Sequence, residues 1–297
     1  MKAILLSVCI FCLLAGSTHA QVLESKSPVH LRAWAKSQDG NPGEEQISNA
    51  GSRISIPYVY LREADVMWAK RVWQEIDLRE KVNHPLYYPA QPVRHRMSLM
   101  SSLWKSAVDE GSLTVYQDED FKFPYTVEEL KGKLSDTTWV TMPNPNDPDY
   151  DTTYMVVKEF DPADVFYYWI VEDWFFDNKR SVLEKRIIGL APMREKYTTD
   201  PNTGERILQG KEVLFWVYFP QARDMLVTME VFNRWNDTER MTFDDLFFKR
   251  MFNSRIIKAD NVYDRYISEY KLGLDALLEA ETLKKQFQEF EMDLWEY

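Results

Sequence analysis

The sequence predicts an α+β fold, in which helices pack on a mainly antiparallel β-sheet. Two kinds of apolar periodicity occur along the chain: spacings of three and four residues, typical of helices, and alternation, typical of strands. Hydrophobic residues make up 45% of the chain and aromatic residues 14%, including 10 Trp. A chain of 297 residues with this composition can bury a large core.

The first twenty residues have the three-part pattern of a cleavable secretory signal peptide. Lys2 provides the charge, an apolar run extends from Ala3 to Ala15, and small residues lead to Ala20. The apolar run is shorter than the roughly 20 residues of a membrane-spanning helix, so residues 1–20 are expected to direct export. Residues 21–52 are rich in Ser, Gly, Pro, Asn and Gln and are expected to form a flexible leader.

Both cysteines, Cys9 and Cys12, fall within the signal peptide, and neither follows the small residue that precedes a lipid-attachment cysteine. The exported chain would therefore have no lipid anchor and no disulfide, and its stability would come from its core. No later segment is apolar for long enough to insert directly into a membrane. The formal net charge of −11 disfavours nucleic acid and anionic membranes as main partners.

A folded α+β core is expected over residues 53–270. Ile and Tyr alternate with other residues over 54–60, which predicts a strand at its start. Over residues 61–76, Trp68, Val72 and other apolar residues fall on one face at helical spacing, which predicts a helix.

A second helix is predicted from Met97 to Val108, ending near Gly111, because glycine is the usual residue just after a helix. Between residues 116 and 154 we expect short strands and a polar loop. The loop is the segment MPNPNDPDYD, residues 142–151, whose three prolines argue against regular structure.

A third helix is predicted to begin at Asp161-Pro162-Ala163-Asp164, which offers a capping residue and a first-turn proline. Its body, VFYYWIVEDWFF, is apolar almost all round, which indicates a central, buried element. The motif Ala-Asp-Val followed by two Trp residues occurs both here and at residues 64–73. This similarity is either a faint internal repeat or a coincidence.

Turn residues at 200–204 separate two strand-like runs, the later being EVLFWVYF at 212–219, and predict a hairpin in a sheet that includes residues 205–219. Thr242 and Asp245 have the spacing of a capping box and predict that another helix starts there.

The C-terminal segment, residues 271–297, is predicted to be a helix with a heptad seam. The seam residues are Ala276, Ala280, Leu283, Phe287, Phe290 and Leu294. The seam can pack on its own domain or dock on a partner. For the second alternative, the candidate partner-binding residues are Leu283, Phe287, Phe290, Leu294 and Trp295.

No catalytic or cofactor-binding constellation is found. The exported chain would contain only His30, His84 and His95, it has no nucleophile motif, and no glycine-rich phosphate loop is present. The run of acidic residues after Asn146 resembles the opening of a calcium loop, but Lys158 stands where that loop needs a glutamate. We therefore expect no catalytic residue, no metal site and no cofactor.

Glu172 and Asp173 lie between two tryptophans, and paired carboxylates beside aromatic rings are a feature of glycosidases. Adjacent residues point in different directions on a helix and to opposite faces on a strand, so these two carboxylates would not flank one bond. A carbohydrate-binding or glycan-cleaving protein remains the main alternative to a structural role. A carrier of exported cargo, with a broad apolar groove, is a third possibility.

Two long segments carry a resemblance to a known family. They are LREADVMWAKRVWQEIDLREKVNHPLYYP at residues 61–89, and EVFNRWNDTERMTFDDLFFKRMFNSRIIKADNVYDRY at residues 230–266. Both resemble the gliding-motility protein family GldN, called PorN in non-gliding Bacteroidetes, and the similarity extends over about residues 54–270.

The resemblance implies a structural, non-enzymatic component of the type IX secretion system, located in the periplasm at the inner face of the outer membrane. Members of this family associate with a lipoprotein, GldK or PorK, in a ring. They also contact the periplasmic part of GldM or PorM, which works with GldL or PorL. The family has no known activity or cofactor, so no catalytic residue is carried over.

Overall fold

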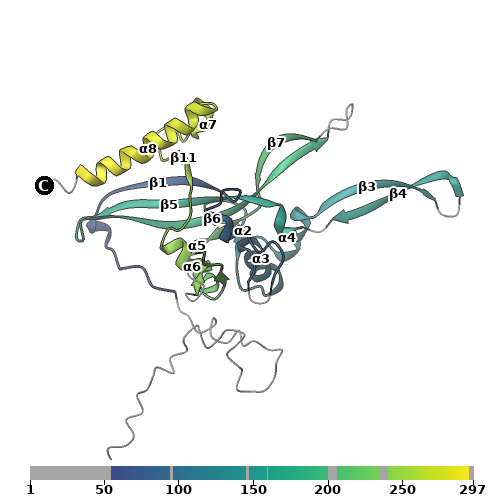
Figure 1. Ribbon diagram of the computed structural model, residues 1–297, viewed down its shortest axis with the longest axis horizontal. Helices are drawn as coiled ribbons and strands as arrows, with labels where there is room; N and C mark the ends of the chain where they lie inside the picture. Colours follow the sequence, from purple (N-terminus) through teal and green to yellow (C-terminus); the bar gives the residue numbers. More distant parts are fainter. Residues whose placement is uncertain are drawn as a thin grey trace, which may run out of the picture.

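The computed structural model of the chain describes residues 55–93, 96–144, 147–158, 160–199, 206–234 and 240–293. The expected signal peptide and leader lie outside these residues, as do His30, His95, Leu294 and Trp295. Within the described residues the expected α+β class is confirmed, because helices accompany a mainly antiparallel sheet (Figure 1).

Within the described part of the chain, the main sheet has seven strands in the order β11-β1-β5-β6-β8-β2, with β7 paired to β6. Its strands are β1 (Val66–Asp77), β2 (Val115–Tyr116), β5 (Val165–Asp177), β6 (Val182–Thr199), β7 (Arg206–Val213), β8 (Trp216–Tyr218) and β11 (Arg255–Ala259). Two further antiparallel pairs are β3 (Asp136–Asn144) with β4 (Asp147–Lys158), and β9 (Glu230–Val231) with β10 (Met241–Thr242).

The helices are α2 (His84–Tyr87), α3 (Leu99–Trp104), the π-helical turn η4 (Lys105–Asp109), α4 (Val127–Leu134), α5 (Phe219–Leu226), α6 (Phe243–Phe248), α7 (Ile267–Tyr270) and α8 (Leu274–Asp293). Two short 3-10 helices, η3 (Glu63–Asp65) and η5 (Pro162–Asp164), come directly before β1 and β5. In the view of Figure 1, α8 lies above β1 and β5, whereas α3, α5 and α6 lie below them.

The helix expected from Met97 to Val108 is confirmed as α3 and its continuation η4. Ser98 caps its start, since its hydroxyl accepts a hydrogen bond from the amide of Ser101 at 3.1 Å. Gly111 follows its end with a φ of 63°, a conformation that glycine adopts without strain.

The helix start at Thr242 and the antiparallel pairing of the strands on either side of residues 200–204 are also confirmed. The amide of Asp245 donates to the Thr242 hydroxyl at 3.2 Å, which forms the expected capping box of α6. Strands β6 and β7 form the hairpin, although its turn lies outside the described residues. The strand expected over 212–219 is instead divided between β7 and β8, which pair with different parts of β6.

The helix expected over residues 61–76 is wrong, because most of this stretch is strand β1. The first half of β1 alternates in burial, and its second half, from Val72 to Ile76, is buried at every position. A strand buried on both faces has apolar residues at neighbouring positions, and their spacings then imitate a helix.

The helix expected after Asp161 is wrong beyond its first turn. The Asp161 carboxylate accepts a hydrogen bond from the Ala163 amide at 2.9 Å, but this cap starts only the single turn η5. Residues 165–177 then form β5, which lies between β1 and β6, so the expectation of a central buried element is confirmed. The two similar Ala-Asp-Val segments both form a 3-10 turn before a long strand, and the two strands pair.

Three shorter expectations are corrected. Residues 55–60 form no strand, and the ring of Tyr58 instead packs against guanidinium groups. The stretch expected to hold only short strands and a loop contains helix α4, which begins with a Thr126–Glu129 capping box. Most of the proline-rich segment 142–151 belongs to β3 and β4. Among the described residues both are edge strands, and an edge strand tolerates proline because the missing backbone N–H can fall on its unpaired side.

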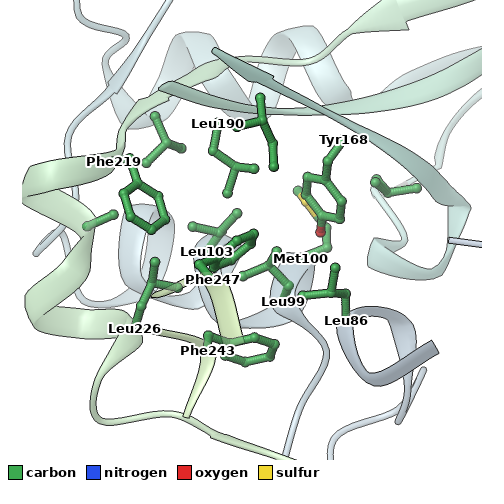
Figure 2. Close-up of a cluster of buried hydrophobic side chains, with 14 of the residues drawn as sticks. Leu86, Leu99, Met100, Leu103, Tyr168, Leu190, Phe219, Leu226, Phe243 and Phe247 are labelled. Carbon is green, nitrogen blue, oxygen red and sulfur yellow. The ribbon is translucent and has the colours of Figure 1, made fainter. Parts of the chain in front are cut away.

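The main core is the set of buried side chains that the sheet shares with α3, α5 and α6. Figure 2 shows Leu103, Phe219 and Phe243 from the helices facing Tyr168 and Leu190 from the sheet. All five have at most 1% of their surface exposed. The main core therefore holds together elements that are far apart in the sequence.

Candidate interaction surface

Helix α8 forms the most distinctive surface feature of the C-terminal region. It begins directly after Gly273, whose φ of 56° lets the chain turn into the helix. Its sequence, LDALLEAETLKKQFQEFEMD, consists mostly of residues with high helix propensity. The predicted C-terminal helix is therefore present, and contacts with β11 and α7 hold it beside the sheet.

The seam of α8 packs on its own domain. Phe287 is 7% exposed and its ring lies 6.0 Å from that of Trp68 and 5.0 Å from that of Trp174. Phe290 lies 5.0 Å from Trp68. We call the buried set around these contacts the α8 cluster: Val72, Trp174, Leu183, Ile256, Ala259, Ile267, Ala280 and Phe287.

The other side of α8 exposes apolar residues, and we call it the outer face. It comprises Leu274, Leu277 and Leu278 in the first turns of the helix, with exposed fractions of 70%, 43% and 56%. Leu272, just before the helix, is also exposed. Large apolar side chains gathered on an exposed helix are typical of a protein-binding surface.

A buried ionic network supports α8 from below. The fully buried carboxylate of Glu172 accepts hydrogen bonds from Arg250 at 2.8 and 3.1 Å and from the indole of Trp174 at 2.8 Å. The amide of Gln74 also donates to it. Arg250 itself has a φ of 53°, which an L-residue rarely adopts. This network fixes the ring of Trp174 on which Phe287 packs.

Two hairpins project from the body of the molecule (Figure 1). Strands β3 and β4 are hydrogen-bonded only to each other among the described residues. Beyond Arg194, β6 leaves β5 and pairs only with β7. In this second hairpin Ile207 and Leu208 are each 53% exposed. Among the described residues the outer edges of both hairpins carry unpaired backbone groups, with which a neighbouring chain can pair.

The structure separates the residues that the sequence suggested for partner binding. Leu283 and Phe287 belong to the inner side of α8, and Phe290 contacts Trp68. Leu294 and Trp295 lie outside the described residues. The sequence analysis missed the outer face, although the three leucines in the segment LDALLEA stand off the heptad seam and could have indicated it.

The carboxylates considered for glycan cleavage are placed on different faces of β5. Glu172 is held in the network described above, whereas Asp173 pairs with Arg71 at 2.7 Å. Glu75, a second buried carboxylate, is paired with Lys211 at 2.8 Å and Arg255 at 2.6 Å. Each of these carboxylates is paired with a cationic side chain, and Glu172 and Asp173 cannot flank one bond.

Within the part of the chain that the structure describes, no three His, Cys, Asp or Glu side chains are grouped closely enough to hold a metal. His84 instead lies with its ring 5.5 Å from that of Tyr88. No helix among the same residues is both long and apolar enough to span a membrane.

A long helix with an apolar outer face, beside two projecting hairpins, is typical of a subunit that binds other proteins. The family model described as "Gliding motility associated protein GldN" matches residues 61–296. The chain belongs to this family, whose members are structural components of the gliding-motility and type IX secretion machinery. A search among curated proteins gave no match.

Proposed function

We propose that this chain is a non-enzymatic structural subunit of the periplasmic ring of the type IX secretion machinery. In this role it bridges an outer-membrane lipoprotein, GldK or PorK, and the motor complex of GldL and GldM or of PorL and PorM. It works in the periplasm beside the inner face of the outer membrane. Membership of the GldN family and the exposed binding surfaces described above support this proposal.

The observation that carries the proposal is the outer face of α8. The inner side of the helix is fixed on the sheet by Ala280 and Phe287, so the exposed Leu274, Leu277 and Leu278 are held in one place. Covering a leucine of this kind contributes about 1.5–3 kcal/mol. Such a preformed apolar face can bind a partner without first ordering the helix.

In this proposal the seam residues and the outer leucines have different roles in docking. Leu283, Phe287 and Phe290 position the helix, and the outer face makes the contact. Leu294 and Trp295, which continue the chain beyond α8, stay predicted contacts with the partner.

Self-association within the ring also stays a prediction. The two projecting hairpins are the natural candidates for this contact, because β3, β4 and β7 present unpaired strand edges among the described residues. Exposed Ile207 and Leu208 add apolar area to one of them.

The proposal is tested by mixing the purified chain, without its first twenty residues, with a soluble form of the lipoprotein and measuring the mass of the product. Leu278→Asp places a charge on the outer face and is expected to weaken the complex at least about tenfold. The matched control is Val82→Asp, since Val82 is 51% exposed on a turn before α2.

Both variants are expected to keep the stability of the parent chain within about 0.5 kcal/mol, because both positions are exposed. If Leu278→Asp binds the lipoprotein and the motor proteins as tightly as the parent chain does, the outer face is not the docking surface. Turnover of a glycan or peptide by the pure protein, abolished by substituting one carboxylate, would contradict the structural role itself.

A further inference from the structure

A polar cavity of about 140 Å³ lies beneath the C-terminal half of α8. Its walls come from three parts of the fold: strands of the main sheet, the segment 250–254 after α6, and α8 itself. Lys185 and Trp174 line it from the sheet, Arg250 from the loop, and Lys284 and Glu291 from the helix. Three cationic side chains thus meet in one cavity of a chain whose net charge is −11.

Lys185 is the most unusual of these groups. Its ammonium nitrogen lies 3.9 Å from the centre of the Trp174 ring. Burial, together with the nearby positive charge of Arg250, lowers the pKa of Lys185. Among the described residues, its Nζ contacts the face of the indole, and the carboxylates of Glu172 and Glu291 attract its charge from farther away.

The charges around the cavity define the anion that it can accept. Arg250 is already neutralised by the buried carboxylate of Glu172, with which it makes two hydrogen bonds. Lys185 and Lys284 remain, opposed by the single carboxylate of Glu291. The uncompensated charge is therefore about one positive unit, which matches a monoanion better than a dianion.

The size of the cavity agrees with this charge. A cavity needs about 10–15 Å³ of such volume to hold one water, so a cavity of about 140 Å³ has room for several waters. A carboxylate with one or two methylene groups occupies a similar space. Lysine ammonium groups can hold its oxygens through charge-assisted hydrogen bonds, while the methylenes contact the Trp174 ring.

We propose that this cavity is a binding site for one carboxylate side chain of an acidic peptide segment on a partner protein. Lys185 and Lys284 hold the carboxylate, and the indole of Trp174 forms the floor. Because Lys185 belongs to the sheet and Lys284 to α8, the bound side chain would also fasten the helix to the body.

The test uses the full exported chain and a blocked peptide with one carboxylate, acetyl-Gly-Glu-Gly-amide, in titration calorimetry at low salt. Lys185→Gln and Lys284→Gln are each expected to weaken binding about tenfold, because each removes a charge-assisted hydrogen bond. The matched control is Lys131→Gln, which removes an equal charge from an exposed position on α4 and should change binding less than twofold. Lys284 lies on the helix surface, so this variant keeps the test valid if Lys185→Gln does not fold.

A variant that is expected to strengthen peptide binding provides a second, independent test. Glu291→Gln removes the carboxylate that competes with the ligand and is expected to strengthen binding several-fold. Two further probes identify the ligand class: the Gln counterpart of the peptide should not bind, and inorganic phosphate should bind more weakly than the Glu peptide.

The proposal is overturned if the Glu peptide does not bind the parent chain, or if Lys185→Gln and Lys284→Gln bind it as the parent does. It is also overturned if the Gln peptide binds equally, which would mean that charge is not recognised. Phosphate binding more tightly than the peptide would contradict the assignment of a carboxylate site.

Discussion

The main core and the α8 cluster are two apolar regions of very different construction. The main core gathers side chains from several strands and from α2 to α6, and many of them, such as Phe243 and Leu103, are fully buried. The α8 cluster depends on one helix near the end of the chain, and its key residue, Phe287, retains 7% exposure. Because the two regions share no buried side chain, we expect that α8 can detach from the sheet while the main core stays folded.

The largest effect is expected from a truncation in the main core. Phe243→Ala removes a fully buried ring at the start of α6 and leaves a cavity that the surrounding side chains cannot fill. The free energy of unfolding should fall by about 3–5 kcal/mol. Denaturant unfolding followed by circular dichroism measures it, and a loss below about 1 kcal/mol would show that this region is not the core that holds the fold together.

A smaller effect is expected from the corresponding change in the α8 cluster. Phe287→Ala should cost about 1.5–3 kcal/mol, because the helix can shift or detach instead of leaving an empty cavity. The loss should be local, with faster proteolysis of α8 and an unchanged unfolding midpoint for the rest. Phe248→Ala is the control, since Phe248 is 54% exposed. Global unfolding by Phe287→Ala would place α8 in the main core.

The smallest effect on stability is expected from removing a single hydroxyl group in the main core. The hydroxyl of Tyr168 is buried and has no hydrogen-bond partner among the described residues, and burial raises the pKa of Tyr168. Tyr168→Phe removes this unpaired group while keeping the ring, and should stabilise the protein by about 1 kcal/mol. Thermal unfolding measures the shift. A destabilisation of that size would mean that the hydroxyl has a partner in solution.

The sequence was most informative where local chemistry decides the structure. Thr242 and Gly111 mark helix ends through a side-chain hydrogen bond and a backbone conformation, and these ends are found where expected. The C-terminal helix follows from a seam of apolar residues at heptad spacing. The heptad spacing alone could not say which surface would cover it.

The sequence was misleading where tertiary burial decides the structure. Residues 66–77 and 165–177 read as helices, because the pairing of two strands in the middle of a sheet buries both faces and removes the alternation. Only the aromatic and β-branched content of VFYYWIVEDWFF favoured a strand. The cavity beneath α8 was also beyond prediction, since Lys185 and Lys284 are separated by a large part of the chain.

Hydrogen–deuterium exchange of the chain, alone and with the soluble lipoprotein, tests the central claim most directly. We expect amides of α8, residues 274–293, to exchange more slowly in the complex, while those of β1 and β5 in the main sheet stay unchanged. Unchanged exchange in α8, with new protection only elsewhere on the surface, would contradict the assignment of α8 as the docking helix.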